Sequence, residues 1–213
     1  MNLWTPQTVV FISLCLFPLS SLAERLSQHS PETSINRYIK LDSQGNPMPA
    51  LSGATPTTSG WDCVVDTQTK LVWEVKTTAG LRGLDNIYTW YNPDARVNGG
   101  KAGYRDGGKC TDSRCDTYAY IAAINHLTLC GFASWRLPTR EELRSLVDYT
   151  IKPPRPMIDS RYFPHSAEQF YWSSTADADD PDSAWGIGFA LGYDYSYFKY
   201  GFGYIRLVTD YTR

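Results

Sequence analysis

The chain has 213 residues, a formal net charge of −2 and a pI near 5.9. These values argue against a general nucleic-acid-binding protein, which normally has a basic surface, and the length fits one ordinary domain plus a tail. Aromatic residues make up 14% of the chain, including 15 Tyr and 7 Trp. Tyr and Trp combine a large contact area with a polar group, so this composition is typical of strands and recognition surfaces.

The first 23 residues have the pattern of a secretory signal peptide. Residues 9–19 form an apolar run, and residues 20–23 are small residues suited to cleavage after Ala23. No Lys or Arg precedes the run, so a cytosolic protein with an unusual N-terminus is the alternative. The run is too short to span a bilayer, and no later stretch reaches the roughly 18 apolar residues required. We therefore expect an exported protein, periplasmic, cell-surface or secreted, without a transmembrane segment.

Residues 24–60 are rich in Ser, Thr, Pro, Gly and Gln. Such a composition buries little apolar surface, so a tether is predicted here. Within it, residues 38–41 hint at a short strand, and residues 45–47 form a turn signal. No Gly-x-y repeat is present, which argues against a collagen stalk. The folded domain is then expected over residues 61–213.

The folded part begins at Trp61, where β-branched and aromatic residues become frequent. Residues 62–66 and 71–75 are predicted strands joined by a hairpin-length connection, and residues 87–91 are a third predicted strand. Residues 92–110 contain three turn signals and are predicted to form a long loop. A loop of this length inside a compact domain is usually functional or clamped.

Two helices are predicted in the middle of the chain. The first covers residues 116–129, where Asp116 or Thr117 can serve as N-cap. The second begins after Pro138, with Thr139 as N-cap and a Glu three residues later that completes a capping box. The apolar face of this second helix, against which we expect the core to pack, consists of Leu143, Leu146 and Val147.

Residues 170–213 carry only strand and turn signals. Strands are predicted over residues 170–174, 184–190 and 204–208. Residues 192–203 are rich in Tyr and are predicted to form a hairpin in which alternate side chains face opposite sides. Two helices followed by separate strands and long loops indicate an α+β fold.

Four cysteines remain once the expected signal peptide is removed, and an even number in an exported chain indicates two disulfides. They are Cys63, Cys110, Cys115 and Cys130. The first predicted helix would place Cys115 and Cys130 roughly 20 Å apart, whereas a disulfide needs Cα atoms within about 7 Å. This argument disfavours one of the three possible connectivities, and of the other two we prefer a local Cys110–Cys115 bridge with a Cys63–Cys130 bridge. A zinc site is the alternative, but the usual Cys-x-x-Cys spacing is absent.

The Tyr-rich segment supplies the candidate ligand-binding residues. These are Tyr193, Tyr195, Tyr197, Lys199 and Tyr200. Tyr rings stack well on sugar rings while their hydroxyls form hydrogen bonds. The alternative interpretation is that inward Tyr and Phe residues belong to the core and outward ones only favour β geometry.

Charged residues and histidines are weaker candidates. The four Asp residues between 177 and 182 lack the usual calcium-loop spacing, so we expect a solvated loop and neither metal nor cofactor. Six basic residues between 136 and 161 could attract a sulfated glycan, but interleaved Asp and Glu favour ordinary surface ion pairs. No Ser–His–Asp spacing can be recognised around the three histidines, and no catalytic residue is predicted.

Several short motifs occur in the order found in a known family. They are Trp73-Glu74, Cys115-Asp116-Thr117, Leu129-Cys130-Gly131, residues 135–149, Tyr171-Trp172-Ser173-Ser174, Ala184-Trp185 and Ile205-Arg206-Leu207-Val208. Over roughly residues 61–208 the sequence resembles the Lcl C-terminal domain family, named after the Legionella collagen-like adhesin. The tail has no collagen-like repeats, so the resemblance does not extend to a trimeric stalk.

A fainter resemblance concerns the fold. Residues 136–139 entering a helix, with a late strand at residues 205–208, are similar to the C-type-lectin-like fold of formylglycine-generating enzymes and of retroelement-diversified receptor proteins. This likeness implies two helices with short strands and long loops. It implies no enzyme chemistry, because the oxidase uses a late reactive cysteine pair and this chain has no cysteine after Cys130.

These observations lead us to expect an exported, non-catalytic binding or adhesion module. Its partner would be a glycan, which could be sulfated, or a protein ligand at the cell surface, and the chain could form a homo-oligomer. The alternative is a structural or assembly module of a surface appendage, in which the aromatic face packs against a partner subunit. An enzyme is the third hypothesis, and it would require a pocket with perturbed titratable groups.

Overall fold

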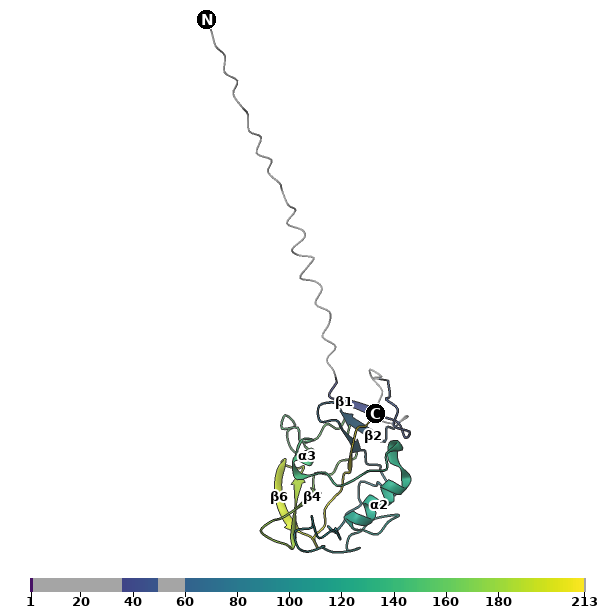
Figure 1. Ribbon diagram of the computed structural model, residues 1–213, viewed down its shortest axis with the longest axis vertical. Coiled ribbons are helices and arrows are strands. Elements are labelled where there is room, and N and C mark those ends of the chain that lie inside the picture. Colours follow the sequence, from purple (N-terminus) through teal and green to yellow (C-terminus); the bar gives the residue numbers. More distant parts are fainter. Residues whose placement is uncertain (2–35, 50–59, 213) are drawn as a thin grey trace. The chain divides into compact units, whose positions relative to one another are not determined.

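The computed structural model describes Met1, residues 36–49 and residues 60–212 (Figure 1). The chain divides into two units, Met1–Ile35 and Asn36–Arg213, and the described helices and strands belong to the second unit. Apart from Met1, the predicted signal peptide lies outside the described residues, as do residues 24–35 and 50–59 of the predicted tether. Within the described ranges, no helix is long and apolar enough to cross a membrane.

The first sheet has four antiparallel strands in the order β1-β2-β3-β7. They are β1 (Tyr38–Leu41), β2 (Cys63–Asp66), β3 (Leu71–Glu74) and β7 (Val208–Asp210). The two central strands are buried along their whole length. Because β1 pairs with β2 over all four of its residues, the folded unit begins at Asn36. The tether predicted over residues 24–60 is therefore corrected: residues 36–49 belong to the fold, and the strand hinted at there is confirmed.

The second sheet has three antiparallel strands in the order β4-β5-β6. They are β4 (Phe170–Ala176), β5 (Ser183–Gly188) and β6 (Tyr193–Phe198). β5 and β6 pair over six residues without a register shift, so the Tyr-rich segment supplies one strand of a β5–β6 hairpin. The hairpin predicted within residues 192–203 is therefore corrected, whereas the predicted alternation of its side chains is confirmed. In Figure 1, β4 and β6 lie on the opposite side of this unit from α2 (Thr117–Leu127). β6 is the edge strand that will carry the candidate site.

Two of the predicted strands do not form as expected. Residues 87–91 make only isolated bridges, to segments near residues 103, 109, 116 and 203. Of residues 204–208, only Val208 lies in a strand. In both stretches the backbone groups find partners on several different segments, so they are satisfied without a continuous ladder.

Both predicted helices are present, and both begin at the predicted caps. The elements are α2, a 3-10 turn η1 (Leu129–Gly131) and α3 (Arg140–Arg144). The Asp116 side chain accepts a hydrogen bond from the Ala119 N–H at 2.8 Å. Thr139 Oγ1 accepts from the Glu142 N–H at 3.1 Å, and the Glu142 carboxylate accepts from the Thr139 N–H at 2.8 Å, which completes the capping box. The second helix is shorter than predicted.

Both predicted disulfides are confirmed. Cys63 of β2 bonds to Cys130 of η1, with Cα atoms 6.5 Å apart, and both residues are fully buried. Cys110 bonds to Cys115, with Cα atoms 5.4 Å apart, and closes the end of the long loop just before α2. The four cysteines thus join the first sheet to the end of α2 and clamp the loop.

The strands separate two hydrophobic clusters, because alternate side chains point to opposite faces. Val65 and Trp172 lie in the first cluster, which includes Tyr120 and Ile124 of α2. Val64 and Tyr171 lie in the second. The second cluster also contains Leu143 and Leu146, with Val147 packed against it, so the predicted inward packing of these side chains is confirmed. Only Leu143 belongs to α3, because the helix ends at Arg144.

Candidate functional site

The exposed aromatic side chains of β6 and the turn after it form the candidate site. We call them the aromatic patch: Tyr193, Tyr195, Tyr197, Phe198 and Tyr200. Alternation places the first three on one face of the edge strand, with exposed fractions of 67%, 43% and 41%. Four of the five candidate ligand-binding residues named from the sequence are therefore exposed on one continuous segment.

The two central tyrosines of the patch rest on a rigid aromatic base. The Tyr195 ring lies 4.7 Å from the Phe170 ring, and the Tyr197 ring stacks on Trp172 at 6.1 Å between centroids. Gly201 is required beneath Tyr197, because a Cβ atom there would lie 2.2 Å from that ring. Partial burial in this stack raises the pKa of Tyr195, and the neighbouring Tyr197 adds to the effect. Both rings therefore present one fixed face outward.

At the far end of the patch, Tyr200 contacts two aromatic residues that were not selected from the sequence: Phe198 of the patch and Tyr104, which adjoins it. Phe198 stacks on Tyr200 at 5.2 Å and 7° between ring planes. Tyr104, from the long loop, meets Tyr200 edge-on at 5.6 Å. Phe198 belongs to the Tyr-rich segment and could have been included on that signal. The position of Tyr104 depends on the tertiary structure, although a functional role for the loop was expected.

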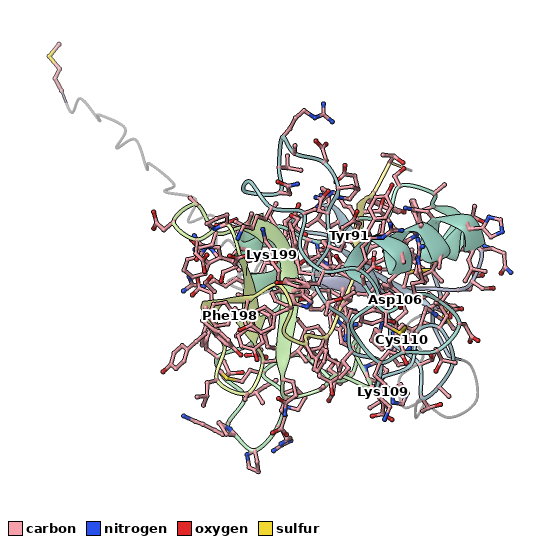
Figure 2. The ribbon with its side chains drawn as sticks, turned by 90° about the horizontal axis from the view of Figure 1, so that it is seen from below. Tyr91, Asp106, Lys109, Cys110, Phe198 and Lys199 are labelled. Atoms are coloured by element: carbon pink, nitrogen blue, oxygen red, sulfur yellow. A yellow bond between two sulfur atoms is a disulfide. The ribbon has the colours of Figure 1, made fainter. Side chains whose placement is uncertain are left out.

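The prediction that Lys199 is a ligand-binding residue is corrected, because its side chain is fully buried and cannot take part in an exposed contact surface. Its Nζ donates to the backbone carbonyls of Asn98 (2.8 Å), Lys101 (2.8 Å) and Pro181 (2.7 Å), and it lies 4.6 Å from the centre of the Trp90 ring. Burial lowers the pKa of this ammonium group. Figure 2 shows Lys199 next to Phe198, with Asp106 and Cys110 of the long loop on the other side of the view. The residue joins the long loop to the loop between β4 and β5.

The acidic loop between β4 and β5 is tied into local bonds. Asp177 accepts from the Ser196 hydroxyl, Asp180 accepts from the Ser183 hydroxyl, and Asp182 pairs with Lys101. In the part of the chain that the structure describes, no group of three or more His, Cys, Asp or Glu side chains is placed to hold a metal ion. The loop therefore offers no argument for calcium.

Most of the basic group between residues 136 and 161 forms ion pairs. Its four paired members are Arg136 with Glu142, Arg140 and Arg144 with Asp194, and Arg161 with Asp159. Lys152 and Arg155 are exposed. This arrangement supports the expectation of ordinary surface pairing. His126 and His165 are both exposed, and His29 lies outside the described residues.

A buried ionic cluster joins the end of β3 to α2. Lys76 Nζ donates to Glu74 at 3.0 Å and to the Tyr120 hydroxyl at 2.8 Å, and Tyr120 also donates to Glu74. The Leu207 N–H donates to the second Glu74 oxygen at 3.0 Å. Burial lowers the pKa of Lys76 to about 8, and the Glu74 carboxylate partly opposes this shift. Each partner is engaged internally, which fits a structural role.

The lowered pKa of Lys76 predicts a pH dependence of stability. Lysine in the unfolded chain titrates near pH 10.4. Between about pH 8 and that value the unfolded chain binds more protons at this residue than the folded chain, so its contribution to the free energy of unfolding rises with pH. A ¹³Cε NMR titration of the folded protein, assigned with Lys76→Arg, should give a midpoint near pH 8 for Lys76. A midpoint at the unfolded value would contradict the burial argument.

Comparison with known proteins gives one family. Residues 62–209 match the model described as Lcl C-terminal domain. No curated protein and no solved structure matches the sequence. The matched segment covers well over half of the chain and includes both disulfides, both helices and the aromatic patch. The chain therefore belongs to the Lcl C-terminal domain family.

Proposed function

We propose that this chain is an exported, non-catalytic adhesion module that binds a glycan through the aromatic patch. The proposal is carried by one observation: three tyrosines at alternate positions of an edge strand are exposed on the same face. Membership of a family named after an adhesin supports a binding role. Two disulfides are consistent with an oxidising compartment outside the cytosol.

The chemistry of the patch suits a sugar ligand. Tyrosine rings stack against the apolar faces of sugars, and their hydroxyl groups can donate to and accept from sugar hydroxyls. The rings of Tyr195 and Tyr197 are held by Phe170 and Trp172, so little conformational entropy is lost when a ligand binds. A sulfated ligand is a finer version of this proposal. The basic group supports it weakly, because four of its six members already pair with carboxylates.

The second candidate function is a structural or assembly module of a surface appendage. It is favoured by the apolar character of the patch, since a large exposed apolar area usually marks a protein interface. The two functions differ in ligand binding: a recognition module binds an added glycan saturably, whereas an assembly module binds only protein subunits. An enzyme remains the third hypothesis and would be supported only by measured turnover.

Glycan binding predicts a loss on removing either central tyrosine. We expect Tyr195→Ala or Tyr197→Ala to weaken binding about tenfold or more, which corresponds to roughly 1.4 kcal/mol. The measurement is a glycan array that includes sulfated glycosaminoglycans, probed with the oxidised chain from residue 24 onward. Calcium or chelator and two salt concentrations should be compared. The matched control is Tyr118→Ala, which removes a similarly exposed tyrosine from α2.

The outcomes separate the hypotheses. Binding that falls with salt and not with the tyrosine substitutions would move the site to the basic residues. If Tyr118→Ala weakens binding as much as Tyr195→Ala, the loss is not specific to the patch. Absence of binding to every glycan under all conditions would reject the glycan proposal and leave a protein partner.

A further inference from the structure

The outer edge of β6 is uncovered, unlike the other sheet edges of the described chain. The Met48 N–H donates to Lys40 of β1 at 2.9 Å, and Arg136 exchanges two 3.0 Å bonds with Val208 of β7. The outer side of β4 receives Tyr204 in a parallel bridge and donates to a carbonyl at residue 138. Within residues 36–49 and 60–212, the side of β6 that faces away from β5 has only a local turn bond, from the Gly201 N–H to the Phe198 carbonyl.

The pairing pattern identifies the peptide groups on this edge. The Lys199 N–H donates to the Asp182 carbonyl at 2.8 Å, so residue 199 bonds toward β5. Antiparallel strands alternate between residues that bond to one neighbour and residues that bond to the other. Tyr193, Tyr195 and Tyr197 therefore direct their backbone groups toward β5. The outward backbone groups are those of the residues between and after them, Asp194, Ser196 and Phe198.

This edge also lacks most features that protect natural edge strands. Such strands are usually short, bulged, or carry Pro or Lys. β6 has six residues, no bulge against β5, and the sequence Tyr-Asp-Tyr-Ser-Tyr-Phe. Its one charge, Asp194, lies 3.6 Å from Arg140 and 3.8 Å from Arg144. The edge is therefore free to form a further strand pair.

We propose that β6 pairs antiparallel with β6 of a second copy of this chain, about a two-fold axis at Tyr195. In this register Tyr195 lies opposite Tyr195 of the second copy. Tyr193 of one copy then lies opposite Tyr197 of the other, and Asp194 lies opposite Ser196, whose hydroxyl it can meet. An axis at Asp194 would place two carboxylates directly opposite each other, which is destabilising. An axis at Ser196 would place Asp194 opposite Phe198. The strand is thus self-complementary in one register, as a two-fold interface requires.

Such a dimer would join the two β4-β5-β6 sheets into one sheet and bring the two aromatic patches together. The inference does not depend on what the patch binds. A monomer that binds glycan would reject the dimer and leave the proposed function intact. A dimer that binds no glycan would support the pairing of β6 and reject the glycan proposal.

Single cysteine substitutions test the register in the oxidised, exported chain. Directly opposed residues that do not bond to each other have Cα atoms about 4.5 Å apart, within the range that a disulfide spans. We expect Tyr195→Cys to form a covalent dimer on mild oxidation. Tyr193→Cys alone should not form a covalent dimer, because residue 193 of one copy would be displaced by about 13 Å along the strand direction from residue 193 of the other. A mixture of Tyr193→Cys and Tyr197→Cys chains should crosslink, because these two positions lie opposite each other. Titration of one free thiol per chain before oxidation confirms that the native disulfides are intact.

Sedimentation of the unmodified chain provides an independent readout. We expect a dimer, which Ser196→Pro converts to monomer by removing an outward N–H. The control Ser196→Ala loses the same hydroxyl and keeps the N–H, so it should remain dimeric. The proposal is overturned if the unmodified chain stays monomeric up to its solubility limit, or if Ser196→Cys crosslinks in place of Tyr195→Cys.

Discussion

Replacing Cys63 and Cys130 together by Ala is expected to lower the free energy of unfolding by about 4 kcal/mol. The bridge joins residues 67 positions apart, so it removes a large loop-closure entropy from the unfolded chain. It also connects β2 to η1 at a point where both cysteines are fully buried. The loss would be a large part of the total stability of a domain this size.

The matched control for this prediction is the double Ala substitution of Cys110 and Cys115. These residues are only five positions apart, so the same entropy argument predicts a loss of about 2 kcal/mol. Both variants should be compared with the unmodified chain by urea unfolding without reductant, followed by tryptophan fluorescence and far-UV circular dichroism. Equal losses in the two variants would show that loop length does not govern the effect.

Lys199→Met is expected to lower the free energy of unfolding by about 3 kcal/mol. Methionine has a similar length but no donor, so three carbonyl groups lose their shared ammonium partner. Part of the loss is offset because a charged group no longer has to be buried. Since Lys199 directly follows β6 and joins the long loop to the β4–β5 loop, we also expect weaker ligand binding at the aromatic patch.

Lys101→Met is the control for the Lys199 prediction. Lys101 is an exposed lysine of the same region, and its side chain pairs with Asp182 at the surface. Exposed pairs contribute about 1 kcal/mol or less, so this variant should stay close to the unmodified chain in a urea titration. A Lys199→Met variant as stable as Lys101→Met would contradict the inferred role of the buried ammonium group.

The features predicted correctly from the sequence depend on residues that lie close together in the chain. The capping box at Thr139 needs a carboxylate three residues away, and the Cys110–Cys115 bridge closes a short turn. For the Cys63–Cys130 bridge, the helix between Cys115 and Cys130 excluded one of three pairings, and the preference for a short Cys110–Cys115 bridge selected between the other two. The α+β class and the alternation of tyrosines in β6 follow from periodicity in the same way.

Other features were decided only by the tertiary structure. Lys199 follows an exposed strand and carries a charge, and both facts predict exposure. It is buried because three carbonyls, contributed by residues 18, 98 and 101 positions away in the chain, converge on its Nζ. Residues 87–91 have strong β propensity, yet their partners lie on several segments, so no ladder forms.

The candidate site likewise combines features that the sequence predicts with features that only the tertiary structure decides. The sequence by itself determined which segment is rich in tyrosine and which of its side chains alternate, because these are properties of consecutive residues. The tertiary structure decided that Phe170 and Trp172 support Tyr195 and Tyr197, and that Tyr104 joins the end of the patch. It also decided that β6 is an edge strand, because the order of strands in a sheet depends on contacts between distant segments, which local patterns do not specify.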